Sequence, residues 1–368
     1  MKVNRWRGIA VAAMVGAALA GCESLLGVED LTHTGSVEET DASAADALSP
    51  DAAAWVPMAS CAVAGSGMTD CGPAFDESCC TSPLVPGGSF SRRYNGATGG
   101  DLSDPASVSS FRLDKYEITV GRFRRFVAAW LLGWRPGAGA GKHVHLNSGS
   151  GLTGIGGVGF EAGWDPSWTA GLPTSQTAWD TKLLDANCAS RATWTSELGA
   201  NEKLPVTCIS WQEAAAFCIW DGGFLPTEAE WMYAAAGGAQ QRYYPWSDPP
   251  TTPTVNATYA NYCPSPCSNP VAAQVGSRPL GNGRWGHADL AGNGAEWLLD
   301  WYGCADCSAR SYPEGSCVDA VNLTQGSGGR SFRDTAFIRF VVSIQNRGPN
   351  DLRFDRFGEM GARCARAP

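Results

Sequence analysis

Leu225-Pro226-Thr227-Glu228-Ala229-Glu230-Trp231 marks the start of a helix. Thr227 and Glu230 form a capping box, in which the Thr hydroxyl accepts from the N–H of Glu230 and the Glu carboxylate accepts from the N–H of Thr227. Pro226 stands directly before the cap. The pattern predicts a helix from this point to about Ala236.

Two more helix starts lie upstream. Ser210-Trp211-Gln212-Glu213 is another capping box and predicts a helix through Trp220, which Asp221-Gly222-Gly223 ends. Phe111–Ile118 alternates as a β-strand does, and Thr119 then caps a third helix. The apolar positions of that helix share one face, which is more typical of a core than of a cofactor site: Val120, Phe123, Val127 and Trp130.

The composition favours a loop-rich globular fold. At about 150 residues per domain, the 368 residues correspond to two domains, or to one large domain with appendages. Gly (45), Pro (22) and Trp (15) are numerous and only 17% of the residues are charged, which excludes coiled coils, helical repeats and wholesale disorder. The net charge of -9 argues against a nucleic-acid partner, because nucleic-acid binders are basic over at least one domain.

The negative charge is concentrated near the N-terminus. No Lys or Arg occurs between Arg7 and Arg92, whereas residues 23–91 contain eleven acidic residues. The 25 acidic and 24 basic residues after Ser91 nearly balance. Residues 22–54 contain few large apolar side chains, so they are predicted to form an acidic, flexible spacer.

The first residues have the pattern of an export signal. Three basic residues precede an apolar run at 9–20, which is too short for a membrane-spanning helix but suits a secretory signal. Leu19-Ala20-Gly21-Cys22 resembles the bacterial lipobox, in which the Cys is lipidated after cleavage. We therefore expect a signal peptide at 1–21 and a protein anchored to a membrane of the cell envelope through Cys22, facing the periplasm or the exterior. An ordinary signal peptide that happens to contain Cys22 is the alternative.

Fourteen cysteines suit an oxidising compartment, where they persist as disulfides. Without Cys22 their number is odd, so at least one is free or intermolecular if all the others pair. Cys304-Ala305-Asp306-Cys307 could be half a zinc site or a redox motif, but disulfides are favoured because no second such pair exists. Residues 55–84 are too short for a core of their own, so they are expected to be a small module held by disulfides. This module contains Cys61, Cys71, Cys79 and Cys80. Residues 85–368 are expected to form the main domain.

Two further motifs are weak. Residues 154–159 match G-x-G-x-x-G, but no strand precedes them and Pro166 follows where a long helix is required, so a surface loop is expected. His143-Val144-His145 could donate two imidazoles to a metal, yet this pattern in a Gly-rich loop is more often incidental.

Five motifs, taken together, are similar to the formylglycine-generating enzyme or sulfatase-modifying-factor family. This resemblance implies an α+β, irregular and loop-rich fold related to C-type lectins, in a single main domain with an N-terminal tether. Phe111–Trp130 resembles the entry segment of the family. The other motifs follow in the order of the family: Leu204-Pro205-Val206 with Ser210-Trp211 and 225–231, Tyr244-Pro245-Trp246, Asp289–Trp297, and Gly361-Ala362-Arg363-Cys364.

Members of this family that make formylglycine oxidise a substrate cysteine with O₂. They use copper held by two thiolates spaced C-x₄-C after a Gly-Gly-Ser motif, and soft thiolates suit Cu(I). In the matching segment here, Gly328–Arg339, Asp334 and Arg339 stand where the two cysteines should be. No Cys occurs between Cys317 and Cys364, so the resemblance does not extend to copper or to formylglycine oxidase activity. Asp334 and Arg339 could form a salt bridge instead.

Other departures from the family pattern concern the pocket and the disulfides. Ala295 replaces an aromatic residue, and Phe224 replaces an Arg. Of two disulfides in the family, the resemblance implies that Cys218–Cys364 is kept. The other pair would fall near Ala235 and Ile344, and both of its cysteines are missing.

The resemblance also implies a structural calcium ion. Its ligands would be the side chains of Asp289 and Glu296 and the carbonyls of Gly292 and Gly294, because calcium prefers hard oxygen ligands. The alternative is that both acids are only hydrogen-bonded. A second calcium site would begin at Asn261-Tyr262, although Cys263 and Cys267 occupy its loop.

Two functions are compatible with these observations. The first is a binding or structural module whose loop-built cleft takes an envelope protein, a peptide or a glycan. The second is an oxidoreductase of the same family that uses a cleft around Ser331, Asp334 and Arg339. The missing thiolate pair favours the first.

Overall fold

The computed structural model describes residues 59–92, 105–188, 191–264, 267, 270–302, 318–325, 329–337, 347–349 and 356–368. The predicted signal peptide, Cys22, the acidic spacer, Cys304, Cys307 and Arg339 lie outside these residues. No helix within these ranges has the length and apolar character that a membrane span requires.

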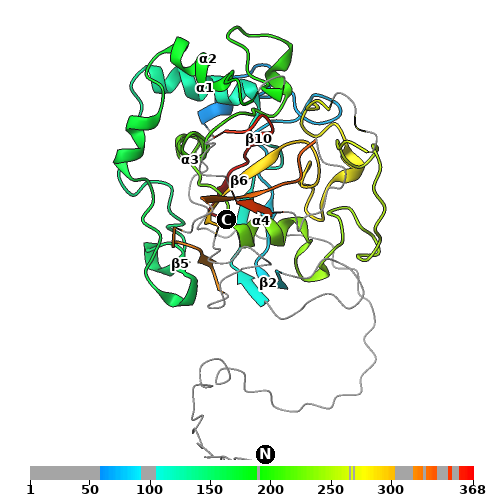
Figure 1. Cartoon of the computed structure of the whole chain (residues 1–368). Helices are drawn as coiled ribbons and strands as arrows, with labels where there is room; N and C mark the ends of the chain where they lie inside the picture. Colours follow the sequence, from blue (N-terminus) through cyan, green and yellow to red (C-terminus); the bar gives the residue numbers. More distant parts are fainter. Residues whose placement is uncertain are drawn as a thin grey trace, which may run out of the picture. The chain divides into compact units, whose positions relative to one another are not determined.

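The described chain is a mixed α+β fold of short elements joined by long loops. The helices are α1 (Val120–Leu131), α2 (Gln176–Leu183), α3 (Trp211–Trp220) and α4 (Glu228–Ala235). The strands are β1 (Leu84–Val85), β2 (Gly88–Ser91), β3 (Pro105–Val108), β4 (Phe111–Leu113), β5 (Thr153–Gly154), β6 (Ala295–Trp301), β7 (Ala320–Val321), β8 (Arg330–Arg333), β9 (Arg347–Pro349), β10 (Met360–Gly361) and β11 (Ala365–Arg366). Figure 1 shows α1 and α2 side by side, and β6 beside β10.

The predicted helix caps are present. The hydroxyl of Thr119 accepts from the N–H of Arg122 at the start of α1. Ser210 and Thr227 each form the complete capping box, before α3 and α4 respectively. Helix α3 ends at Trp220 as predicted, and α4 ends at Ala235.

The strand predicted for Phe111–Ile118 is shorter than expected. Only Phe111–Leu113 forms a strand, β4, between β1 and β11. The N–H groups that follow bond to two different segments: Asp114 and Ile118 to the carbonyls of Cys364 and Ala362 near the C-terminus, and Lys115 to that of Thr81. Because these partners belong to no single strand, a regular ladder cannot continue.

A four-stranded sheet with the order β10-β6-β8-β9 positions the site residues. Strand β6 runs antiparallel to β8, with Glu296 opposite Arg333 and Trp297 opposite Phe332. On its other edge β6 runs parallel to β10. Trp211 on α3 donates from its indole N–H to the carbonyl of Leu298, 2.8 Å away, which ties this helix to β6.

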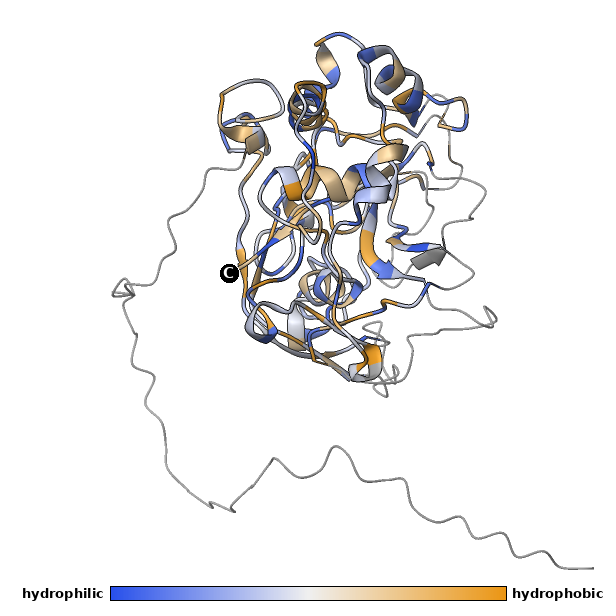
Figure 2. Ribbon diagram, turned by 90° about the vertical axis from the view of Figure 1, so that its left-hand side faces the viewer, coloured by the Kyte–Doolittle hydropathy of each residue, from blue (hydrophilic) through white to orange (hydrophobic). Residues whose placement is uncertain are grey.

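The core is largely aromatic. Phe123 of α1 lies 5.9 Å from the rings of both Trp179 on α2 and Phe217 on α3, and all three side chains are completely buried. Hydrophilic and hydrophobic residues are interspersed along the ribbon in Figure 2, and helix α4 is buried along its whole length.

Disulfides join segments that are far apart in the sequence. Cys218 and Cys364, the pair implied by the family resemblance, are bonded across 146 residues and tie α3 to the C-terminal segment. Residues 59–84 also pack against α1 and α3 through the N–H of Ser60, which donates to Asp221 at 2.7 Å. The other disulfides are Cys61–Cys80, Cys71–Cys79, Cys188–Cys208 and Cys263–Cys267.

Candidate functional site

A buried ion pair occupies the strand where the family resemblance places copper chemistry. Glu228, in the first turn of α4, accepts from Arg333 at 2.6 Å and from the hydroxyl of Ser331 at 3.2 Å. The N–H of Glu228 donates to Asp300 on β6, 2.7 Å away. This face of β8 is therefore held by hard oxygen and nitrogen groups, which are not the soft ligands that Cu(I) prefers.

The two positions expected to replace the copper cysteines are not both described. Asp334 follows β8 directly and is half-buried. Arg339 lies outside the described residues, so the predicted salt bridge between them stays a prediction. The described cysteines provide no thiolate elsewhere, because all ten of them are in disulfides.

The loop predicted to bind calcium is shaped by a carboxylate that the sequence analysis did not single out. Glu117 accepts from the N–H of Gly294 and from the side chain of Asn293, both at 2.6 Å. Gly292 has φ of +107°, and a Cβ there would lie 2.8 Å from the carbonyl oxygen of Asn261. The loop therefore requires glycine at this position.

The predicted ligand side chains already have protein partners. Asp289 accepts from the N–H of Gly276 at 2.6 Å. Glu296 binds Arg363 through both carboxylate oxygens, at 2.7 Å and 2.8 Å, and also accepts from the indole of Trp231 at 2.8 Å. Within the described ranges, no three carboxylate, imidazole or thiol side chains converge as a metal site would require. Calcium at this loop therefore stays a prediction, and an ion would have to share Glu296 with Arg363.

Negative charge is nevertheless in excess around this loop. Burial raises the pKa of Glu117 well above its usual value, and the charges of Asp289 and Glu296 raise it further. Burial also raises the pKa of Asp289 to about 6. Three carboxylates thus interact with the guanidinium of Arg363 in a buried region, and Arg278 also lowers the pKa of Asp289.

The second calcium position makes contacts within the protein. The side-chain amide of Asn261 donates to the carbonyl of Val271 at 3.0 Å and to the side chain of Asn293 at 3.1 Å. Its carbonyl accepts from the N–H of Asn293 at 2.8 Å. Tyr262 packs partly buried against the apolar core, and Cys263 is bonded to Cys267. Calcium at Asn261-Tyr262 also stays a prediction.

His143 is completely buried between two carboxylates. Its Nδ1 lies 3.0 Å from Glu161, and its Nε2 lies 3.3 Å from Glu230, the capping-box residue of α4. Burial alone would lower the pKa of His143, but its hydrogen bonds and charge interactions with Glu230 and Glu161 outweigh this effect and raise the pKa to about 9. His143 therefore ties the Gly-rich loop to α4 and is not incidental, whereas the neighbouring His145 is half-buried.

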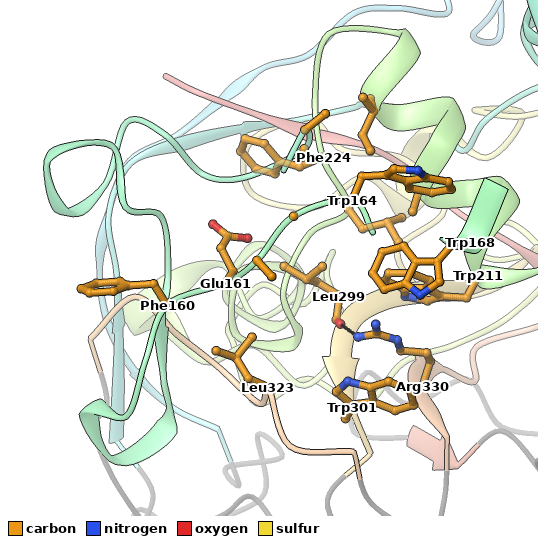
Figure 3. A pocket seen from close by; sticks show the side chains of 17 residues that line it. Phe160, Glu161, Trp164, Trp168, Trp211, Phe224, Leu299, Trp301, Leu323 and Arg330 are labelled. Carbon is orange, nitrogen blue, oxygen red and sulfur yellow. Dashed lines mark hydrogen bonds between the residues drawn. The ribbon is translucent and has the colours of Figure 1, made fainter. Parts of the chain in front are cut away.

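An aromatic cavity of about 240 Å³ lies next to the Glu161–His143–Glu230 cluster. Glu161 forms part of its wall, as does Leu323 (Figure 3). Residues 160–164 of the wall directly follow the G-x-G-x-x-G motif. That motif begins at the last residue of β5 and continues as a short 3₁₀ helix at Ile155–Gly157. The aromatic side chains of the wall are Phe160, Trp164, Trp168, Trp211, Phe224 and Trp301.

Arg330 is the positively charged residue of this wall. Its guanidinium lies between two indoles, 3.7 Å from the ring centre of Trp211 and 3.9 Å from that of Trp301 (Figure 3). It donates to the carbonyl of Leu299 at 2.7 Å. Burial lowers the pKa of Arg330 to about 9, although the negative charge of Asp300 opposes the shift.

These features differ in how far the sequence signals them. Arg330 separates Gly329 from Ser331, so it interrupts the Gly-Gly-Ser pattern of the family, and this could have marked it. Glu117 and Arg363 are charged residues inside the recognised motifs, but their partners lie far along the chain. Nothing local distinguishes His143 from His145.

Comparisons with known proteins agree with the motif order. A family model described as sulfatase-modifying factor enzyme 1-like domain matches residues 69–368. The chain is 32% identical over 190 residues to the formylglycine-generating enzyme of Streptomyces coelicolor, which covers 46% of this chain and 55% of that protein. It is 34% identical over 129 residues to inactive C-alpha-formylglycine-generating enzyme 2 of Bos taurus, which covers 34% of this chain and 42% of that protein. The chain thus spans about half the length of these relatives.

Solved structures with a similar fold include PvdO from Pseudomonas aeruginosa. The TM-score is 0.47 at 17% identity, over 83% of this chain and all of that chain. For CarF the TM-score is 0.46 at 16% identity, over 78% of this chain and 98% of that chain.

The His143 cluster predicts a loss of stability at alkaline pH. Because the pKa of His143 is raised in the folded state, its contribution is fully present below the unfolded value of about 6.5 and is lost as the pH rises through about 9. The free energy of unfolding, measured with urea between pH 6 and pH 10, should fall by about 3 kcal/mol more in the wild type than in His143→Gln. His145→Gln is the control and should keep the wild-type pH dependence; equal curves for the wild type and His143→Gln would contradict this role.

Proposed function

Since this chain belongs to the family of sulfatase-modifying factor enzyme 1-like domains, we propose that it is a non-catalytic member, a binding module tethered in the cell envelope. One observation supports this most strongly. On β8, directly before the copper position at Asp334, Ser331 and Arg333 are bound to Glu228, and no described cysteine is free of a disulfide. A relative from Bos taurus named as inactive indicates that the domain can exist without the activity.

The residues present do not fit copper. Oxidation of a cysteine to formylglycine by this family's route depends on two soft thiolates that hold Cu(I). The segment from 318 to 363 contains no cysteine. The alternative is an oxidoreductase that uses Ser331, Asp334 and Arg339 in a different way.

The envelope location and the lipid anchor rest on the sequence. The motif before Cys22 and the five disulfides of the described residues both suit a protein outside the cytoplasm. An envelope protein, a peptide or a glycan could then reach the folded domain beyond the acidic spacer at 22–54.

Calcium at Asp289, Gly292, Gly294 and Glu296 is part of the proposal. The carboxyl groups of Glu117 and Asp289 have raised pKa values, and a bound cation would favour their ionised forms; Asp289 would supply the hard oxygen that calcium prefers. The ion would fix the loop at residues 289–294 to the start of β6, and would thereby stiffen the domain.

The absence of formylglycine formation can be tested directly. Purified protein is incubated with Cu(I), O₂ and a peptide with the cysteine motif of sulfatases, and mass spectrometry follows the aldehyde. We expect no conversion above the no-enzyme control, because the thiolate pair is missing, while the Streptomyces coelicolor relative serves as positive control. Conversion by this chain would contradict the proposal and favour the oxidoreductase.

Lipidation is tested by growing the expressing bacterium with an alkyne-labelled fatty acid. The wild type should incorporate the label, and Cys22→Ser should not, because this cysteine is the expected attachment site. Cys304→Ser is the control and should be labelled like the wild type. An unlabelled wild-type protein would support an ordinary signal peptide instead.

Calcium binding should stabilise the folded protein. At a free calcium concentration a hundred times its Kd, the gain is about 2.7 kcal/mol, so a chelator should lower the Tm by several degrees. Asp289→Asn should reduce the effect of the chelator without abolishing it, because it removes the charge but keeps a side-chain oxygen that calcium can bind. A wild-type Tm that chelation leaves unchanged would contradict a structural ion. Glu296→Ala is unsuitable here, because it also removes the partner of Arg363.

A further inference from the structure

We propose that the aromatic cavity binds a small organic carboxylate, whose flat apolar body packs among the tryptophans and whose carboxylate meets Arg330. This rests on the proposed function as a binding module and adds the chemical class of the ligand. The cavity of about 240 Å³ is slightly smaller than the roughly 300–1,000 Å³ usual for drug-sized ligands, so it suits a molecule of about one ring with a short side group.

Arg330 differs from five buried arginines in having no carboxylate hydrogen-bond partner among the described residues. Its guanidinium donates to the backbone carbonyl of Leu299. Asp300, whose negative charge raises the pKa of Arg330, accepts from the N–H groups of Glu228 and Asn322. Five buried arginines each bind a carboxylate: Arg122, Arg333, Arg356, Arg363 and Arg366.

The position of Arg330 leaves its hydrogen-bonding edge for a ligand. Trp211 and Trp301 cover the two faces of the guanidinium, and these indole faces are not acceptors for its in-plane N–H groups. One N–H bonds to Leu299. A guanidinium presents five N–H donors in a planar fork that matches a carboxylate, so the remaining donors form an anion site at the wall of the cavity.

The rest of the wall favours a flat apolar body over a second charge. Trp164 and Trp168 meet edge to face, 5.3 Å apart, and offer aromatic surface to the cavity. Glu161 is the acidic residue of the wall, but its carboxylate is already used by His143 and by the N–H of Leu152. Its negative charge would direct the carboxylate of a ligand away from it and toward Arg330.

The test compares two probes of the same shape. Phenylacetate and phenylacetamide are titrated into the purified protein by isothermal titration calorimetry. Phenylacetate should bind about tenfold or more tightly than the amide, because its carboxylate gains charge-assisted hydrogen bonds. In Arg330→Gln this preference should disappear, whereas Arg330→Lys should keep part of it because the positive charge remains.

Arg135→Gln provides a matched control. Arg135 also stacks on a tryptophan, 3.9 Å from the ring centre of Trp130, but it is exposed and outside the cavity. This variant should bind phenylacetate as the wild type does. A Tm close to the wild-type value is required of each variant, so that a loss of binding is not a loss of folding.

Three results would overturn the inference: equal affinity for the acid and the amide, full binding of phenylacetate by Arg330→Gln, or no binding of either probe. Binding of a neutral methyl glycoside in preference to phenylacetate would overturn it as well and would point to a glycan. None of these results alters the outcome of the copper assay, so a failure here is distinct from a failure of the non-catalytic proposal.

Discussion

A buried group of two arginines and two aspartates connects the parts of this fold. Arg122 on α1 lies 2.6 Å from Asp221, at the end of α3, and 3.0 Å from Asp114, just after β4. Arg366 on β11 lies 2.8 Å from the same Asp221. Arg122 also donates to Ser60 in the N-terminal segment. Because removing one member of a buried ion pair leaves an uncompensated charge, at a cost of about 3–5 kcal/mol, these segments are strongly coupled.

Short elements explain why such long-range contacts matter. Strands β1, β10 and β11 have two residues each, so their own ladders contribute few hydrogen bonds. The stability of the fold depends instead on aromatic packing, on disulfides such as Cys218–Cys364 and on buried pairs such as Glu296–Arg363. The loops that carry the candidate sites are held by the same contacts.

Local signals predicted helices α1, α3 and α4, whereas α2 was not predicted although Ser175 caps it. Ser210 and Thr227 cap helices with groups only three residues away, so sequence alone places them. The strand at Phe111–Ile118 is cut short because its backbone partners alternate between two distant segments, one at Thr81 and one at Ala362–Cys364. The Glu161–His143–Glu230 cluster and the cavity at Arg330 likewise bring together residues far apart in the chain. Spacing along the sequence does not predict such contacts.

Strand β8 gives the domain two separate faces. Side chains alternate along a strand, so Arg330 turns toward the aromatic cavity while Ser331 and Arg333 turn toward Glu228 on α4. The anchoring of the sheet and the chemistry of the cavity are therefore assigned to different residues of one four-residue strand. A substitution at position 330 on the cavity side therefore leaves the contacts of Ser331 and Arg333 with Glu228 in place.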